Sequence, residues 1–264
     1  MAIESLKPKR FSRRKFLLTS FLAAGGVVAD ARLLEPGWLK TWRIRLCDGT
    51  PTHRFVHFTD VHFKGDRDLI LELVRQINAL SPDFVCFTGD LIEEMKFLAP
   101  ALELMAGIKS PVYAIPGNHD YWSQASFVKF ANGFAKTGGA WLMDESLVVA
   151  GGKINLIGLS CSSHGVSSPP PVRADARNIL LMHFPAWVKR LKAEKYDLLL
   201  AGHSHGGQVR IPFVGPLVLP YFVDEYDLGM FKTGAGPLYV NPGIGWFPVP
   251  VRFNCRPEIT VFEV

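Results

Sequence analysis

The sequence has few cysteines, and their spacing matches no cysteine-based site. Four cysteines occur in 264 residues, with no C-x-x-C pair and no zinc-ribbon pattern. A structural zinc site built on thiolates is therefore not expected. Cys86 lies in the apolar run Phe84–Phe87, where a buried thiol is the ordinary outcome. The spacing assigns no disulfide pair.

The main part of the chain also lacks an excess of charge of either sign. The net charge is +5, but residues 1–15 contain six basic residues and one acidic residue and account for all of it. A groove for DNA or RNA needs Lys and Arg gathered on the folded domain, so no nucleic-acid partner is expected. The composition, 48% hydrophobic and 20% charged, excludes a disordered chain or a coiled coil.

The N-terminus combines a basic segment with a short apolar one. Arg13, Arg14 and Lys15 precede fourteen uncharged residues, 16–29, an arrangement typical of export signals. Residues 12–17 (Ser-Arg-Arg-Lys-Phe-Leu) resemble the twin-arginine (Tat) signal. We predict that residues 1–31 are a Tat signal or a membrane anchor, the alternative being a basic amphipathic segment on the membrane surface.

The length of this apolar segment bears on whether it can cross a membrane. Fourteen helical residues span about 21 Å, whereas the hydrocarbon core of a bilayer is about 30 Å thick. A spanning helix would therefore have to recruit Leu33 and Leu34, beyond the charged residues Asp30 and Arg32.

Beyond residue 50, apolar strands alternate with amphipathic helices, which favours an α/β fold. Strands are predicted at residues 54–59, 83–88, 112–115, 147–149, 154–159, 178–182, 198–201, 238–240 and 259–262, and helices at 66–80, 97–108, 123–136 and 186–195. Ser123 is the predicted N-cap of the third helix. No low-complexity linker divides the chain, so we predict one domain over residues 50–264.

Five polar clusters each follow the end of an apolar strand. They are Asp60-x-His62, Gly89-Asp90, Gly117-Asn118-His119-Asp120, His183 and Gly202-His203-Ser204-His205. Ligand sites of open α/β sheets lie at the carboxyl ends of strands. Asp, Asn and His donors suit Mn, Fe, Zn, Ni or Co. Each cluster alone is common in turns, but the ordered set predicts a metal site.

This ordered set resembles the motifs of the calcineurin-like (class III) metallophosphoesterases. The resemblance implies a four-layer α/β/β/α sandwich that binds two divalent ions, of which Mn, Fe, Zn and Ni are candidates. The implied ligands are Asp60, His62 and His205 for one ion, Asn118, His183 and His203 for the other, and Asp90 between them. His119 would be the catalytic histidine, and Asp120 would orient it.

The chemistry of such a site is hydrolysis of a phosphoester. Two cations about 3.5–4 Å apart can hold a bridging hydroxide for in-line attack and clamp the phosphate oxygens. His119 would protonate the leaving alkoxide, and Asp120 would fix its tautomer. The resemblance therefore implies a metal-dependent phosphodiesterase or pyrophosphatase.

A narrower resemblance extends over nearly the whole chain. Residues 35–38 (Glu-Pro-Gly-Trp), 202–212 and 252–259 are similar to the YkuE/YaeI-type phosphodiesterases. This implies a bacterial cell-envelope enzyme, exported by the Tat machinery or anchored at the inner membrane. It also implies a lipid-linked pyrophosphate substrate, such as UDP-2,3-diacylglucosamine of lipid A synthesis.

Other interpretations remain beside this one. Tyr121 and Trp122 directly follow the Gly117-Asn118-His119-Asp120 motif and are predicted to contact the substrate, although aromatic side chains more often pack in the core. A non-catalytic scaffold of the same fold would be expected to lack ligands, and this chain keeps all of them. A nuclease is disfavoured by the neutral body, and a protein serine/threonine phosphatase by the Tat-like signal.

Overall fold

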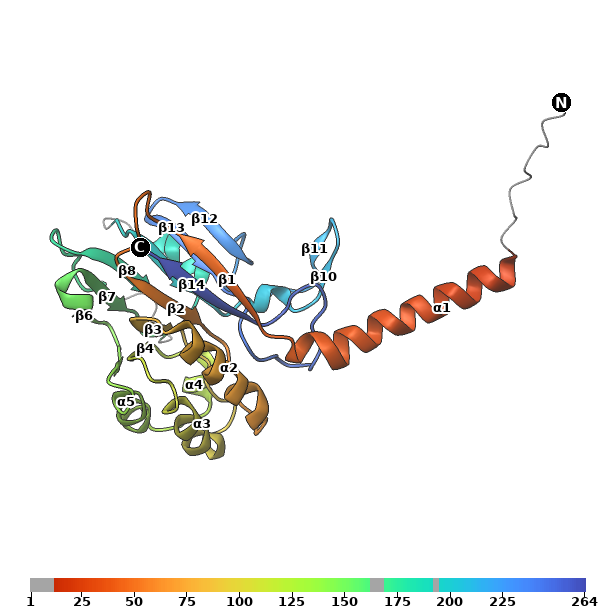
Figure 1. The fold of residues 1–264 in the computed structure, drawn as a ribbon, viewed down its shortest axis with the longest axis horizontal. Helices are drawn as coiled ribbons and strands as arrows, with labels where there is room; N and C mark the ends of the chain where they lie inside the picture. Colours follow the sequence, from red (N-terminus) through yellow and green to blue (C-terminus); the bar gives the residue numbers. More distant parts are fainter. Residues whose placement is uncertain (1–11, 162–168, 192–194) are drawn as a thin grey trace, which may run out of the picture.

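Two six-stranded sheets form the body of the molecule in a computed structural model that describes residues 12–161, 169–191 and 195–264 (Figure 1). The first sheet has the order β1 (Lys40–Arg45), β14 (Glu258–Glu263), β2 (Arg54–Phe58), β3 (Phe84–Phe87), β4 (Val112–Ala114) and β5 (Ala140–Trp141). The second has the order β12 (Gly229–Thr233), β13 (Gly236–Val240), β9 (Leu198–Ala201), β8 (Arg177–Leu181), β7 (Ile154–Gly158) and β6 (Glu145–Val149). A separate pair, β10 (Arg210–Ile211) and β11 (Gly215–Pro216), forms a small antiparallel hairpin.

The central strands of each sheet are parallel, which gathers their carboxyl ends at one edge. In the first sheet β2, β3, β4 and β5 run parallel, and in the second β7, β8, β9 and β13 do. Strands covered on both faces are continuously apolar, as in β3 and β9, whose residues are all buried.

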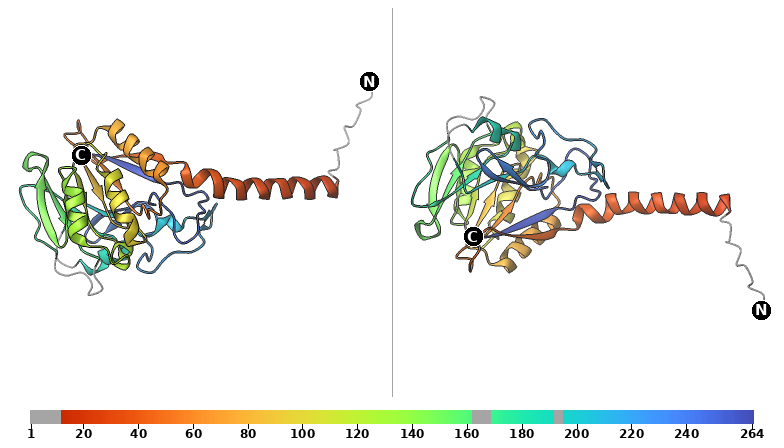
Figure 2. Two further views of the ribbon diagram at one scale, coloured as in Figure 1. Left: turned by 90° about the horizontal axis from the view of Figure 1, so that it is seen from below. Right: turned by 90° about the horizontal axis from the view of Figure 1, so that it is seen from above.

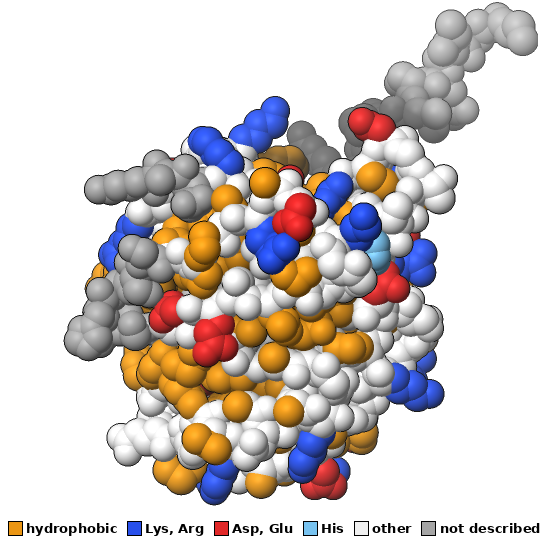
Figure 3. All heavy atoms as spheres, turned by 90° about the vertical axis from the view of Figure 1, so that its left-hand side faces the viewer, with side chains coloured by type: hydrophobic (Ala, Val, Ile, Leu, Met, Phe, Trp, Pro, Cys, Tyr) orange, Lys and Arg blue, Asp and Glu red, His pale blue; other side chains and the backbone are white. Residues whose placement is uncertain are grey.

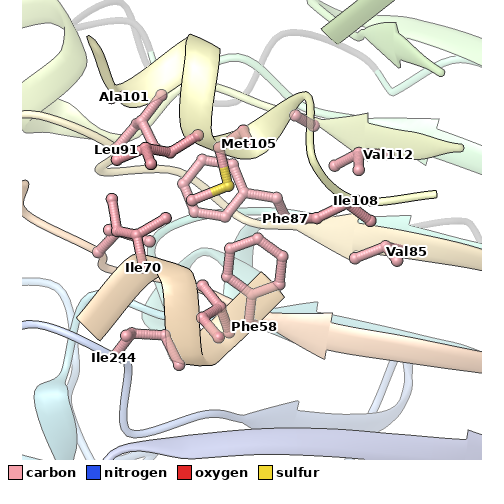
Figure 4. Packing of buried hydrophobic residues seen from close by; sticks show 14 of the residues in the cluster. Phe58, Ile70, Val85, Phe87, Leu91, Ala101, Met105, Ile108, Val112 and Ile244 are labelled. Carbon is pink, nitrogen blue, oxygen red and sulfur yellow. The ribbon is translucent and has the colours of Figure 1, made fainter. Parts of the chain in front are cut away.

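Hydrophobic packing defines the layers of the sandwich. One cluster lies between the first sheet and the helices α2 (Arg67–Leu80), α3 (Leu98–Met105) and α5 (Phe127–Ala135). Figure 4 shows Phe58 and Phe87 of the sheet packed together with Ile70 of α2 and Met105 of α3. A second cluster, with Phe55 and Leu156, fills the space between the sheets. The predicted α/β sandwich is confirmed.

The layer outside the second sheet differs from the prediction in detail. A third cluster there includes Trp187 and Val188, which belong to the 3-10 helix Pro185–Arg190. An α-helix over 186–195 was predicted, and residues 192–194 of that range lie outside the described residues. Pro185 occupies the first position of the 3-10 turn, where a missing backbone N–H costs nothing.

Two predicted boundaries change in the structure. Ser123 does not begin a helix: it is the C-cap of the short helix α4 (Asn118–Trp122), and its hydroxyl donates to the Asp120 carbonyl. Helix α5 begins instead after the N-cap Ser126. The first sheet also includes β1, which precedes residue 50 and pairs in parallel with β14. β1 is an exposed edge strand, so its sequence lacks the apolar run that marks the central strands.

Helix α1 (Arg13–Ala29) projects from the body and continues past its expected end (Figures 1 and 2). A π-helical turn (Asp30–Leu34) and a 3-10 turn (Glu35–Gly37) extend it through the charged positions. Twenty-five residues, Arg13–Gly37, span about 38 Å. Among the described residues, this stretch is the one that is long and apolar enough to cross a membrane.

Candidate metal centre

The predicted ligands converge at the edge where the parallel strands of both sheets end. Asp60 and His62 follow β2, Asp90 follows β3, and Asn118 follows β4 in the first sheet. His183 follows β8 and the pair His203 and His205 follows β9 in the second. All of them are buried except His203, which is partly exposed. The structure therefore brings together every residue predicted to bind metal.

The backbone at these positions is held in an uncommon conformation. Five of the predicted ligands have a left-handed φ: Asp60 (52°), His62 (45°), Asp90 (61°), His203 (67°) and His205 (50°). Each such residue costs about 1–3 kcal/mol, a strain typical of functional sites. The turns after β2, β3 and β9 therefore aim side chains at a common point at the expense of stability.

Two motif glycines let the ligand loops touch. A Cβ atom on Gly117 would lie 2.1 Å from Oδ1 of Asp90, and one on Gly202 would lie 2.4 Å from Oδ2 of Asp60. Real carbon–oxygen contacts are never that short, so no other residue fits at either position without moving a ligand carboxylate. The glycines of these motifs thus permit close approach of the loops.

Asp60, His62 and His205 form the first candidate metal group. Oδ1 of Asp60 lies 3.6 Å from Nε2 of His62 and 3.6 Å from Nε2 of His205. The two imidazole Nε2 atoms lie 3.0 Å apart. Oδ1 of Asp60 is buried and has no hydrogen-bond partner among the described residues. An orphaned carboxylate oxygen that faces two imidazole nitrogens fits a divalent cation.

Asp90, His183 and His203 form the second group. Nδ1 of His183 donates to the Thr88 carbonyl (2.7 Å), so its Nε2 faces Oδ2 of Asp90 (3.2 Å) and Oδ1 of Asn118 (3.0 Å). Oδ2 of Asp90 is also 3.5 Å from Nε2 of His62, which places this carboxylate between the two groups. Nε2 of His203 donates to the Tyr221 carbonyl (2.8 Å), leaving its Nδ1 as the ligand atom.

The electrostatics of the cluster favour positive charge. Burial opposes ionisation, but the neighbouring histidines outweigh it and hold the pKa values of Asp60 and Asp90 well below their usual range. Conversely, burial lowers the pKa of His62 and His183, yet nearby carboxylates raise both to about 9. A site that draws protons onto two buried histidines attracts cations. The donor set therefore fits two divalent ions.

Glu93 is part of the centre, and sequence analysis did not identify it. Its Oε2 lies 3.0 Å from Nδ1 of His119, and its Oε1 contacts Nδ1 of His62. Burial would raise the pKa of the Glu93 carboxyl, but hydrogen bonds with both rings hold it well below its usual range. The sequence feature that could have pointed to Glu93 is its position three residues after Asp90, in Gly-Asp-Leu-Ile-Glu.

Asp120 was predicted to orient His119. Its carboxylate instead binds backbone groups, and the His119 ring is paired with Glu93. The Asp120 carboxylate accepts three backbone hydrogen bonds, from the N–H groups of Asp90 (2.8 Å), Leu91 (2.9 Å) and Gly117 (2.9 Å). Burial and the neighbouring Asp90 raise the pKa of Asp120 to about 7, although these N–H groups oppose the shift. Asp120 fastens the loop after β3 to the turn after β4, because the turn directs its side chain inward.

The two predicted aromatic contacts lie in different surroundings. The Trp122 ring is exposed and lies 4.6 Å from the His119 ring, centroid to centroid. Tyr121 is half-buried and packs edge-on against Phe127 at 4.7 Å. Phe247, from the loop after β13, lies 4.4 Å from the His119 ring. Trp122 and Phe247 therefore flank the candidate catalytic histidine, whereas Tyr121 supports the core.

A cavity of about 590 Å³ opens beside the centre. Its polar end is formed by Asp90, Asn118, His119, His203 and His205. The rest is mainly apolar and is lined by Val209, Leu217, Val218, Leu219, Val249 and Val251. A mostly apolar cleft with a few convergent polar groups is the usual form of a small-molecule site.

Comparison with known proteins agrees with this geometry. Residues 53–207 match the family described as calcineurin-like phosphoesterase. The chain is 32% identical to the uncharacterized metallophosphoesterase YkuE of Bacillus subtilis, covering 97% of this chain and 98% of YkuE. It is 29% identical to the phosphodiesterase YaeI of Escherichia coli, covering 96% and 99%. A bovine transmembrane protein with a metallophosphoesterase domain is 26% identical, covering 98% and 64%.

Proposed function

The chain belongs to the calcineurin-like phosphoesterase family, and from this premise we propose that it hydrolyses a phosphodiester or pyrophosphate bond, with two divalent ions bound at the strand ends. One observation carries the proposal. The buried Oδ1 of Asp60, orphaned among the described residues, faces two imidazole nitrogens, and Asp90 lies between this group and the second one. That arrangement suits two adjacent cations bridged by a carboxylate.

The ligands are proposed as two sets that share one residue. Asp60, His62 and His205 hold one ion, and Asn118, His183 and His203 hold the other, with Asp90 common to both. When bound, the ions supply Lewis acidity that activates water near neutral pH and neutralises phosphate charge. Mn, Fe, Zn and Ni all suit these donors.

His119 is the proposed general acid. Its ring lies at the polar end of the cavity, and its Nδ1 is paired with Glu93. A carboxylate on one ring nitrogen fixes the tautomer and leaves Nε2 for substrate. Protonating the leaving oxygen at that position contributes typically 10²–10⁴-fold to rate. Asp120 serves this step indirectly, by fastening the loops that present Asp90 and His119.

The apolar part of the cavity supports a lipid-linked substrate. The phosphoester would lie at the polar end, and an acyl or other apolar group would lie along the valines and leucines beyond it. A fully hydrophilic substrate would leave that surface uncompensated. UDP-2,3-diacylglucosamine is one molecule with this division of polarity.

Features outside the cavity are consistent with such a substrate and disfavour a nucleic acid. On the face away from α1, Lys and Arg side chains are scattered among acidic and apolar ones (Figure 3). The helix over Arg13–Gly37 is of a length to anchor the protein. We propose a bacterial envelope location, reached through the Tat machinery that the twin arginines at 13 and 14 would engage.

Hydrolysis of three substrates tests the proposal. Bis-p-nitrophenyl phosphate, p-nitrophenyl phosphate and UDP-2,3-diacylglucosamine are offered to wild type, Asp90→Asn and His119→Ala, with Mn²⁺ and with chelator. We expect turnover that depends on Mn²⁺ and that both substitutions abolish. The substrate that wild type hydrolyses fastest then identifies the class of substrate. Two tightly bound ions without turnover on any substrate would instead support the non-catalytic scaffold.

A further inference from the structure

A long uncharged segment lies exposed beside the metal centre. Residues 211–223 (Ile-Pro-Phe-Val-Gly-Pro-Leu-Val-Leu-Pro-Tyr-Phe-Val) contain no charged side chain. They form the turn of the β10–β11 hairpin and the loop that follows it. A run of this composition normally lies in a core, yet here only Val223 is buried.

The exposure is high both in the turn of the hairpin and in the loop that follows it. Phe213 is fully exposed, and Val214, Val218 and Tyr221 each expose three quarters or more of their surface. The hairpin is held by two residue pairs, Arg210 with Pro216 and Ile211 with Gly215. Large apolar side chains on a narrow projection are typical of a contact with another apolar phase.

Hydrogen bonds tie the base of this hairpin to the end of the N-terminal helix. The buried Glu35 carboxylate accepts from the backbone N–H groups of Asn254 (2.7 Å) and Cys255. The adjoining Phe253 pairs with the strand that enters the hairpin, since its carbonyl accepts from Arg210 N–H (2.9 Å). The helix end and the hairpin base are therefore fixed to one short segment.

The two elements consequently share one side of the molecule. In Figures 1 and 2 the hairpin lies on the side of the body from which α1 projects, near the C-terminal end of the helix. A bilayer crossed by α1 would lie directly beyond that side. This relation favours lipid as the occupant over a second copy of the chain, because the helix already brings the lipid surface there.

We propose that residues 211–222, the turn of the β10–β11 hairpin and the loop that follows it, insert into the surface of the bilayer that α1 crosses and hold the cavity mouth against it. Leu217, Val218 and Leu219 of this segment line the cavity. The Tyr221 carbonyl accepts a hydrogen bond from His203, which connects the inserted loop to a metal ligand. The inference rests on α1 as an anchor and not on any catalytic step.

Depth-dependent quenching in proteoliposomes tests the insertion. The full chain carries Cys47→Ser, because Cys47 is the partly exposed cysteine and the other three are buried. A polarity-sensitive fluorophore is attached at Phe213→Cys, at Val214→Cys as a second site, or at Val128→Cys as control. Val128 is equally apolar and 69% exposed, but it belongs to α5, which lies away from the side of the body from which α1 projects. Vesicles of phosphatidylethanolamine and phosphatidylglycerol are prepared with and without doxyl lipid.

Insertion predicts blue-shifted emission at positions 213 and 214 that doxyl lipid quenches about two-fold or more, since interfacial segments reach about 5–10 Å into the bilayer. The probe at 128 stays water-like and unquenched. Water-like, unquenched emission at both hairpin positions would overturn the proposal. A second result would also overturn it: blue-shifted emission that doxyl lipid does not quench and that disappears when the protein is diluted with more lipid. That result indicates contact between copies of the chain. Neither readout depends on hydrolysis, so failure here is distinct from failure of the proposed function.

Discussion

Oε2 of Glu93 lies 3.0 Å from Nδ1 of His119, while its other carboxylate oxygen contacts Nδ1 of His62. One side chain therefore positions both a candidate metal ligand and the candidate general acid. Because each ring uses Nδ1 for this contact, Nε2 of each ring is left for the chemistry. This shared carboxylate fixes the tautomer of both histidines at once.

Removing the charge of Glu93 should slow turnover without unfolding the protein. We expect Glu93→Gln to lower kcat about 10–100-fold, the usual effect of losing a carboxylate that orients a histidine ligand. Glu93→Asp should recover part of the loss because it keeps the charge. The measurement is steady-state kinetics on bis-p-nitrophenyl phosphate at saturating Mn²⁺.

The neighbouring Glu94 provides the matched control. Its side chain is 60% exposed and pairs with Lys96 at the surface, and such pairs contribute little. Glu94→Gln should therefore leave kcat and KM within about two-fold of wild type. Equal kinetics for Glu93→Gln and Glu94→Gln would show that the Glu93 contact has no part in turnover.

Asp120 should matter first for stability. In Asp120→Asn an amide N–H₂ replaces one acceptor oxygen, so at least one of three backbone N–H groups loses its partner. We expect a loss of about 2 kcal/mol in the free energy of unfolding at pH 8, measured by urea denaturation. Asp48→Asn, at an exposed position, is the control and should change little. An Asp120→Asn protein of wild-type stability would contradict the fastening role.

Gly117 should tolerate no side chain. In Gly117→Ala the new Cβ meets Oδ1 of Asp90 at 2.1 Å, so the shared carboxylate must move. A displacement of about 1 Å at a reacting centre can cost about 100-fold in rate, and we expect at least that loss together with weaker Mn²⁺ binding. Gly49→Ala, where nothing lies within 4 Å, should match wild type in both respects. Full activity in Gly117→Ala would show that the two loops are not tightly coupled.

Stability should fall at acidic pH in part because of His57. Burial lowers the pKa of this histidine to about 3, whereas an unfolded histidine titrates near 6.5. The unfolded chain therefore binds the extra proton first, and stability is lost as the pH falls from about 6.5 towards 3. The contribution is about 1.4 kcal/mol per pH unit in that window.

His57→Gln tests this contribution, because Gln keeps a polar partner for the Thr88 hydroxyl that lies 2.9 Å from Nε2. Urea unfolding of both proteins is compared between pH 7 and 4 in the presence of chelator. The variant should show a shallower decline in unfolding free energy. Parallel curves for the two proteins would mean that His57 does not take up a proton on unfolding.

The sequence predicted that the proposed ligands meet at one edge of the sheets, because each motif follows a mainly apolar strand. Chain direction then brings Asp60, Asp90 and His203 to one edge regardless of loop detail. It could not predict which carboxylate contacts His119, since Asp120 adjoins His119 whereas Glu93 is 26 residues away, and the direction of each side chain depends on the turns. The left-handed backbone at Asp90 and the short helix α4 settle that question.

Edge and surface elements were less predictable for a related reason. β1 is mostly exposed, and β12 alternates partly exposed and exposed residues, so neither carries the apolar signal of a buried strand. The uncharged run 211–223 misleads in the opposite sense, because its composition suggests burial and the structure leaves it exposed. The helix after Arg13 continues through Asp30 and Arg32 as a π-helical turn, in which the Ala31 carbonyl accepts from the Arg252 N–H of the body.

Metal dependence of phosphodiester hydrolysis is the sharpest test of whether Asp90 joins two ions in one centre. Protein stripped with chelator is titrated with Mn²⁺ while hydrolysis of bis-p-nitrophenyl phosphate is followed, with Asp90→Asn in parallel. A two-ion centre predicts no turnover in chelator, turnover that saturates with about two bound ions per chain, and no recovery in Asp90→Asn. Turnover that persists in chelator, or that Asp90→Asn retains, would contradict a two-ion centre built around Asp90.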